Sequence, residues 1–256
     1  MGVDYVVFSS YGNDSIALLQ LLHEFRLPEQ RTVAVVYSDT GWANTGWPER
    51  VEKAARWAEG LGYFTARTVP ELGFADLVRK RKIFPRGRAQ FCTSELKIFP
   101  AQKWLDQHDP ERKAICVVGV RRAESQRRSG AQPFVPISEA HGGRSLWHPL
   151  VEFSDEDRDA LIARTGWEVL PHRSDECTCI FSGRKDLRRF SPERVAEILD
   201  LELELDPDGN RTMFRPKAYA GAKGITEVMR WANSERGKYS PEEDDEPDCD
   251  SGMCGA

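Results

Sequence analysis

Short apolar runs alternate with amphipathic stretches along the first half of the chain. Four runs are rich in β-branched and aromatic residues, as strands are: 3–9, 32–37, 63–69 and 114–120. Three stretches between them carry apolar residues at helical spacing: 15–26, 48–61 and 95–108. Pro28 ends the first helix, Pro48 begins the second, and Pro100 either kinks the third or marks its true start. This alternation predicts a doubly wound, mostly parallel α/β sheet, with Cys116 as a buried core thiol in its last strand.

The predicted sheet brings three polar loops together. Ligands of doubly wound sheets bind at the carboxyl ends of the strands. The loops that follow Ser9, Ser38 and Gly119 are therefore expected to share one crevice.

Beyond residue 150 the pattern changes. One helix is expected over 154–164, where Ser154 supplies the N-cap and acidic residues fill the first turn. Another begins at Ser191, with Pro192 at its first position. We therefore expect three units: an α/β core over 1–150, a helical, cysteine-containing appendage packed on that core over 151–239, and an acidic, cysteine-containing tail over 240–256.

The net charge of −5 argues against a protein coated in nucleic acid, yet basic residues cluster locally. Such clusters suit a phosphorylated small molecule or a local strand contact, although a solvated face explains any single one. The cluster over 79–88, which contains Pro85 and Gly87, is expected to be a mobile lid over a polyanionic ligand. The sequence has no apolar run near the roughly 18 residues of a spanning helix, and no secretory signal. We expect a cytoplasmic protein without a membrane partner.

The segment SSYGNDS, from Ser9 to Ser15, joins the first predicted strand to the first predicted helix. Its small residues let backbone N–H groups approach a phosphate, and the helix N-terminus adds about half a positive charge. Asp14 is a candidate ligand for the Mg²⁺ that accompanies nucleotide phosphates. An ordinary strand-to-helix turn capped by serine is the alternative interpretation.

Four further segments complete an ordered set: SDTG from Ser38, CTSELK from Cys92, GVRRAES from Gly119 and WHPLVEFSDED from Trp147. With SSYGNDS, this set resembles the phosphoadenosine phosphosulfate reductase superfamily, a branch of the PP-loop adenine nucleotide α-hydrolases, over residues 3–190. The resemblance implies a parallel α/β sheet in which residues 1–150 are a PP-loop nucleotide-binding core. It also implies an adenine nucleotide as ligand, either ATP with Mg²⁺ or a sulfonucleotide.

The resemblance assigns roles to residues of these segments. The phosphate loop comprises Ser9, Ser10, Gly12, Asn13, Asp14 and Ser15. The residues beside the nucleotide are Ser38, Asp39, Thr40 and Gly41. Lys97 and Arg121 are expected to contact phosphate or sulfate oxygens, while Gly119 and Glu124 shape the far side of the pocket. The residues expected to be catalytic are Asp14, Lys97, Arg121 and Cys92.

Cysteines in a reducing compartment are not expected to form disulfides. Cys177 with Cys179, and Cys249 with Cys254, form two close pairs that favour a bound metal over unligated thiols. Because some reductases of this superfamily hold a four-iron four-sulfur cluster, the resemblance makes that cluster the expected cofactor, with zinc less favoured. Cys92 is the alternative fourth ligand.

Departures from the family pattern bear on the reaction. Tyr11 and Asn13 stand where ATP-cleaving members read Gly and Lys in SGGKDS, yet Asp14 and Ser15 are the ATP-type ending. Reductases carry a Glu-Cys-Gly-hydrophobic-His motif near the C-terminus. The Cys254-Gly255 of this chain has no Glu before it and no His after it.

Three functions follow, and the pattern favours the first. The first is an ATP pyrophosphatase-type, AMP-forming enzyme of the nucleotide α-hydrolase or adenylyl-transfer type, coupled to sulfur transfer or nucleic-acid modification. Its further partner would be a sulfur-donor protein or a nucleic acid. The second is a sulfonucleotide reductase, in which a tail cysteine attacks sulfur and sulfite is released. The third is an inactive nucleotide-binding subunit, supported by Asn13 in place of lysine. The sequence predicts no oligomeric state.

Overall fold

The structure is a computed structural model that describes residues 2–87, 90–208 and 211–234. Its six-stranded sheet has the order β3-β2-β1-β4-β6-β5. Neighbouring strands run parallel, except that β5 pairs antiparallel with β6. The strands are β1 (Tyr5–Phe8), β2 (Val33–Ser38), β3 (Phe64–Thr68), β4 (Ile115–Val118), β5 (Phe134–Ser138) and β6 (Arg144–Trp147). The predicted doubly wound, mostly parallel sheet is confirmed.

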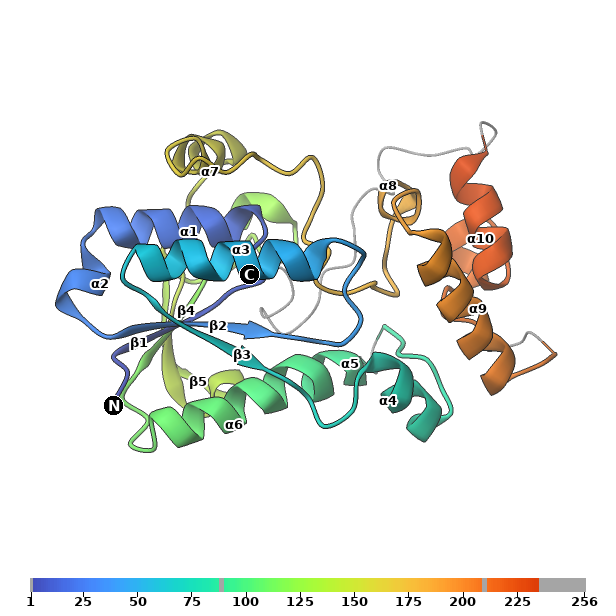
Figure 1. Ribbon diagram of the computed structural model, residues 1–256, viewed down its shortest axis with the longest axis horizontal. Helices are drawn as coiled ribbons and strands as arrows, with labels where there is room; N and C mark the ends of the chain where they lie inside the picture. Colours follow the sequence, from blue (N-terminus) through green and yellow to red (C-terminus); the bar gives the residue numbers. More distant parts are fainter. Residues whose placement is uncertain (1, 88–89, 209–210, 235–256) are drawn as a thin grey trace.

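Helices cover both faces of the sheet, as Figure 1 shows. Those packed around it are α1 (Asn13–Glu24), α2 (Leu27–Gln30), α3 (Trp47–Gly60), α6 (Phe99–His108) and α7 (Asp155–Ile162). Because side chains alternate along a strand, Val7 and Val35 pack against α1 and α3, whereas Val6 and Val36 pack against α6. Cys116 is fully buried on the α6 side, so its prediction as a core thiol is confirmed.

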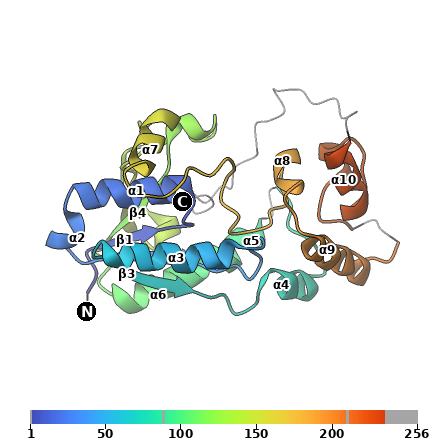
Figure 2. The ribbon, with the colours of Figure 1, turned by 45° about the horizontal axis from the view of Figure 1, so that its top comes forward.

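A third apolar cluster joins the C-terminal helices to the α/β part. The helices around it are α4 (Phe74–Arg81), α5 (Phe91–Thr93), α8 (Arg184–Leu187), α9 (Pro192–Leu205) and α10 (Gly224–Asn233). Leu77 of α4, Ile198 of α9 and Val228 of α10 are all buried in it. Figures 1 and 2 show α8, α9 and α10 grouped at one end of the molecule, with α4 beside α9.

The unit boundaries stay a prediction. The helix that follows residue 150, α7, packs against α1. Its Leu161 and Ile162 belong to the same apolar cluster as Val7 and the buried side chains of α1. The acidic tail over 240–256 lies outside the described residues. Among the described helices, none is long and apolar enough to cross a membrane.

The structure adds detail to two local expectations. Within the expected lid over 79–88, Arg79–Arg81 form the last turn of α4, because Phe74, Leu77 and Val78 bury one face of that helix, and residue 88 lies outside the described residues. The lid itself stays a prediction. The helix expected over 95–108 starts as a π-helical turn, η1 (Ser94–Ile98), which runs into α6. Pro100 lies in the first turn of α6, directly after η1, so it marks the change from the π-helical turn to the α-helix and not the start of the helical segment.

Candidate functional site

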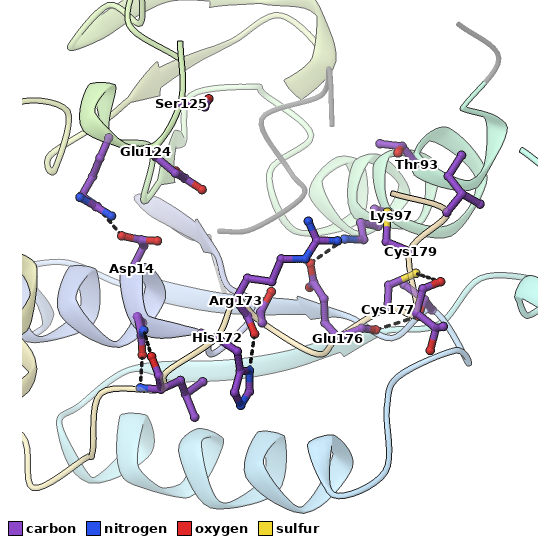
Figure 3. Close-up of a pocket in the computed structure, with 18 of the residues that line it drawn as sticks. Asp14, Thr93, Lys97, Glu124, Ser125, His172, Arg173, Glu176, Cys177 and Cys179 are labelled. Atoms are coloured by element: carbon purple, nitrogen blue, oxygen red, sulfur yellow. Dashed lines mark hydrogen bonds and ion pairs between the residues drawn. The ribbon is translucent and has the colours of Figure 1, made fainter. Parts of the chain in front are cut away.

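A pocket of about 430 Å³ lies at the carboxyl ends of the parallel strands. The loops after β1, β2 and β4 line it together with the segment 170–180, so the predicted shared crevice is present. β1 lies between β2 and β4, where the chain reverses its direction across the sheet, which is the usual ligand position in this architecture. Figure 3 shows Asp14 and Glu124 at one end of the pocket and Lys97, Cys177 and Cys179 at the other.

The phosphate loop is held in shape by its own hydroxyl groups. Ser10 N–H donates to Ser15 Oγ (3.1 Å), and Gly12 N–H donates to Ser10 Oγ (3.3 Å). Tyr11 N–H donates to Ser9 Oγ (3.1 Å). The three serines are buried and lie behind the pocket wall, whereas Gly12 lines the pocket. The serines therefore fix the course of the loop into α1.

Tyr11 turns the chain sharply at this point. Its φ of 58° is a left-handed conformation that non-glycine residues rarely adopt. Burial of the ring and a hydrogen bond from Arg50 Nε to the Tyr11 carbonyl oxygen (2.8 Å) hold it there. The turn delivers Gly12, the N-cap of α1, which has no side chain to occupy the first-turn N–H groups. The start of α1 thus offers backbone donors at the pocket.

Arg121 joins the loop after β4 to the start of α1. Its Nε lies 2.5 Å from Asp14 Oδ1, and its Nη2 lies 2.8 Å from Asp155 Oδ1 in the first turn of α7. The Arg121 side chain is only 2% exposed. Arg121 lines the pocket and is paired with two carboxylates, and its contact with phosphate or sulfate oxygens stays a prediction.

Gly119 lets β4 approach α1 closely. A Cβ added at Gly119 would lie 3.3 Å from Asp14 O and 3.4 Å from Asp14 C. Both are backbone atoms, so any larger residue would push the start of α1 away. Gly119 acts through this close approach and does not itself line the pocket.

Asn13 lines the pocket, but its side-chain amide is hydrogen-bonded to the main chain of Leu170. Its Nδ2 donates to Leu170 O, and Leu170 N–H donates to its Oδ1, both at 2.9 Å. Asn13 therefore anchors the start of the segment 170–180 to the phosphate loop.

The SDTG loop after β2 places one residue in the pocket. Thr40 is fully buried, and its Oγ1 donates to Glu176 O (3.0 Å). Asp39 forms an ion pair with Arg67 of β3. Three residues of this loop lie outside the pocket: Ser38, Asp39 and Gly41.

A buried ion pair between Lys97 and Glu176 lies at the other end of the pocket. Lys97 Nζ lies 2.6 Å from Glu176 Oε1, and the two side chains are 6% and 7% exposed. Burial would lower the pKa of Lys97, but the carboxylate of Glu176 outweighs this effect and raises the pKa, so Lys97 stays charged. Both cations expected at phosphate oxygens, Lys97 and Arg121, are thus matched by carboxylates.

Three thiols line the pocket beside Lys97: Cys92, Cys177 and Cys179. Burial raises the pKa of Cys92 to about 11 and that of Cys177 to about 12. These two thiols are therefore protonated at neutral pH, and a protonated thiol is a poor nucleophile. The Sγ of Cys179 accepts a hydrogen bond from Phe181 N–H (3.5 Å).

The predicted metal site is only half described. Cys177 and Cys179 line the pocket, whereas Cys249 and Cys254 lie outside the described residues. Within 2–87, 90–208 and 211–234, no group of three or more Cys, His, Asp or Glu is arranged to hold a metal ion. The described residues alone therefore do not complete a four-thiolate site, and the cluster stays a prediction.

Glu124 lines the pocket, and it forms an ion pair with Arg128, four residues later in the chain. Several lining residues were not predicted from the sequence: Asp155, Arg158, His172, Arg173 and Glu176. Asp155 lies in the WHPLVEFSDED motif, where the pattern indicates only a helix start. Glu176 precedes Cys177 directly, and that position was its only signal.

Residues 4–180 match the family model of the phosphoadenosine phosphosulfate reductase domain. The chain is 27% identical over 161 residues to an uncharacterized 37.8 kDa protein of Escherichia phage 186, and the match covers 55% of this chain and 46% of that protein. The chain thus spans about half the length of that curated relative.

The solved structures that are similar to this chain include the following two. One is phosphoadenylyl-sulfate reductase from Candida auris, with 14% identity and a TM-score of 0.47, covering 65% of this chain and 74% of that chain. The other is the U34-tRNA thiolase NcsA from Methanococcus maripaludis with its [4Fe-4S] cluster, with 14% identity and a TM-score of 0.47, covering 90% and 71%.

Proposed function

The chain belongs to the phosphoadenosine phosphosulfate reductase domain family, and we propose that it binds an adenine nucleotide in the pocket at the carboxyl ends of β1 and β4. One observation carries the proposal: the start of α1, with Asp14, meets Arg121 from the β4 loop inside this pocket. The first-turn N–H groups and partial positive charge of α1 would hold the phosphate chain.

We further propose that the nucleotide is ATP with Mg²⁺. The charged side chains that line the pocket balance: Asp14, Glu124, Asp155 and Glu176 against Lys97, Arg121, Arg158 and Arg173. A nucleotide polyanion would therefore meet little net positive charge unless a divalent cation came with it. Asp14 is the carboxylate at the start of α1, and carboxylate oxygens suit Mg²⁺. When bound, Mg²⁺ would neutralise charge on the transferring phosphoryl group.

The reaction that fits such a site is AMP-forming. An acceptor oxygen attacks the α-phosphorus of ATP and loses its proton to solvent, the α–β phosphoanhydride bond breaks, and pyrophosphate leaves with the bonding electron pair. AMP then leaves when a second nucleophile displaces it from the adenylated acceptor, or forms directly when the acceptor is water. Arg121 would hold Asp14 in place, and the N–H groups of α1 would stabilise charge on the phosphoryl oxygens. Coupling to sulfur transfer or nucleic-acid modification, with a sulfur-donor protein or a nucleic acid as partner, is the finer form of this proposal.

The proposed cluster would use Cys177, Cys179, Cys249 and Cys254, with Cys92 as the alternative ligand. The support from the described residues is that Cys177, Cys179 and Cys92 line one pocket beside the charged Lys97. The test is the iron, sulfide and zinc content of anaerobically purified protein, together with its visible spectrum. Colourless protein without iron would remove the cluster from the proposal and leave the nucleotide site standing.

Sulfonucleotide reduction is the second candidate, and the family model favours it by its description. It requires a nucleophilic cysteine. The raised pKa of Cys92 does not support Cys92 in that role, which leaves a tail cysteine as the attacking group.

The test is product analysis on the full chain. Incubation with ATP and Mg²⁺, followed by chromatography, should give AMP and pyrophosphate in equal amounts, with each candidate acceptor class supplied in turn. Sulfite released from a sulfonucleotide in the presence of a thiol donor, with no AMP from ATP, would instead establish the reductase. Tight ATP binding with neither product would identify an inactive nucleotide-binding subunit.

A further inference from the structure

The carboxylate of Glu176 forms an ion pair with the ammonium group of Lys97 inside the proposed nucleotide pocket. The Lys97 Nζ to Glu176 Oε1 distance is 2.6 Å, both side chains are more than nine-tenths buried, and both residues line the pocket. Figure 3 shows the two side chains directed at each other across the pocket wall, from η1 and from the segment 170–180. An anionic group of a ligand that contacts Lys97 would therefore compete with this carboxylate for the same ammonium group.

The backbone around Glu176 is fixed independently of its side chain. Thr40 Oγ1 donates to the Glu176 carbonyl oxygen (3.0 Å), and Thr178 N–H donates to Trp42 O (2.8 Å). Asn44 N–H donates to Asp175 O (2.9 Å) on the other side. These bonds tie the segment to the loop after β2 on both sides of Glu176. Rotation of the Glu176 side chain can therefore break this ion pair while the backbone of the segment stays in place.

We propose that Glu176 is an internal anion that holds Lys97 until an anionic group of the ligand displaces it, and that Glu176 thereby sets the affinity of the pocket for its nucleotide. The inference rests on the proposed nucleotide site, and on the role at phosphate or sulfate oxygens that the family resemblance implies for Lys97. A carboxylate and a phosphate that compete for one buried ammonium group oppose each other. Removing the charge of Glu176 should therefore strengthen nucleotide binding.

A purely structural role for the ion pair predicts the opposite change in nucleotide affinity. If the pair serves only to hold η1 against the segment 170–180, loss of one partner leaves an uncompensated buried charge and loosens the pocket. Affinity would then fall together with stability. The direction of the change in affinity separates the two roles.

The experiment is calorimetric titration of the full chain with ATP in the presence of Mg²⁺. Glu176→Gln removes the charge and keeps the shape, and we expect its dissociation constant to fall at least about tenfold relative to the unsubstituted protein. The control is Glu168→Gln, which removes one exposed negative charge just before the same segment and should leave the affinity unchanged. A second variant pair, Lys97→Met with and without Glu176→Gln, should show no gain from the second substitution.

Unchanged or weaker binding by Glu176→Gln, at a melting temperature that shows the variant folded, overturns the inference. If that variant does not fold, Glu176→Asp takes its place, because its shorter side chain withdraws the carboxylate from Lys97, and it should also bind ATP more tightly. Equal or weaker binding by Glu176→Asp would overturn the inference in that case. Failure of the unsubstituted protein to bind ATP overturns the proposed function itself, whereas binding without the Glu176 effect overturns only this inference.

Discussion

Asn13 and Leu170 are 157 positions apart in the chain, yet each donates a 2.9 Å hydrogen bond to the other. The amide of Asn13 matches the N–H and carbonyl groups of one residue, as a neighbouring strand would. A lysine here could not make both bonds, because its side chain only donates. The departure from SGGKDS at this position therefore has a structural reason in this chain.

Asn13→Ala should lower the free energy of unfolding by about 1–3 kcal/mol, because it leaves the two main-chain groups of Leu170 without their partners. Urea denaturation measures the loss. The matched control is Asn233→Ala, which removes one exposed hydrogen bond to Met229 O at the end of α10 and should cost under about 0.5 kcal/mol. Equal losses for the two variants would show that Asn13 does not anchor the segment.

Gly119→Ala should displace the start of α1, because the new Cβ meets backbone atoms of Asp14 at 3.3 and 3.4 Å. We expect a loss of about 1–3 kcal/mol in stability and weaker ATP binding. The control is Gly130→Ala, since a Cβ at Gly130 meets no atom within 4 Å. Thermal unfolding of the two variants side by side measures the difference, and an unperturbed Gly119→Ala protein would contradict the close approach.

The framework of the sheet could be predicted because it depends on local pattern. Apolar runs around Val6, Val35 and Val117 are buried on both faces, so they stand out in the sequence. β5 was missed because its side chains are largely exposed and Pro136 interrupts it. α4 was missed because its basic last turn hides a short apolar face.

Individual charged residues of the site were predicted from the sequence, but the ion pairs between them were not. Lys97 was singled out from its motif, whereas its partner Glu176 is 79 positions away and carries no motif of its own. Arg121 was expected at a ligand, and its two carboxylate partners come from α1 and α7. Such pairings depend on tertiary contacts that no local pattern records.

Acid should destabilise the protein through His141. Burial lowers the pKa of this side chain from 6.5 to about 4. The neutral ring is favoured in the folded state, so its contribution is complete above pH 6.5 and is lost as pH falls toward 4. The loss amounts to about 3 kcal/mol at most. Urea unfolding at about pH 7 and about pH 4.5 measures it, and a His141→Gln protein with the same pH dependence would contradict the assignment.

The thiol of Cys92 should react slowly at neutral pH. Its pKa of about 11 leaves little thiolate at about pH 7.5, and the fraction rises as pH increases from about 9 to 11. Alkylation by iodoacetamide, followed by peptide mass spectrometry, should be at least about tenfold slower in the folded protein than in urea. Rapid alkylation of the folded protein near neutral pH would instead make Cys92 an activated nucleophile and favour the reductase.

The central claim is that the pocket at α1 and Arg121 holds the phosphates of ATP with Mg²⁺. The most direct measurement is equilibrium binding of ATP, with and without Mg²⁺, to the unsubstituted protein and to Asp14→Asn. The amide oxygen that this substitution introduces can still accept the hydrogen bond from Arg121, so the variant should fold, which its melting temperature checks. We predict Mg²⁺-dependent binding of one ATP per chain and at least about tenfold weaker binding by the variant. Equal affinity of the two folded proteins, or affinity indifferent to Mg²⁺, would contradict the account.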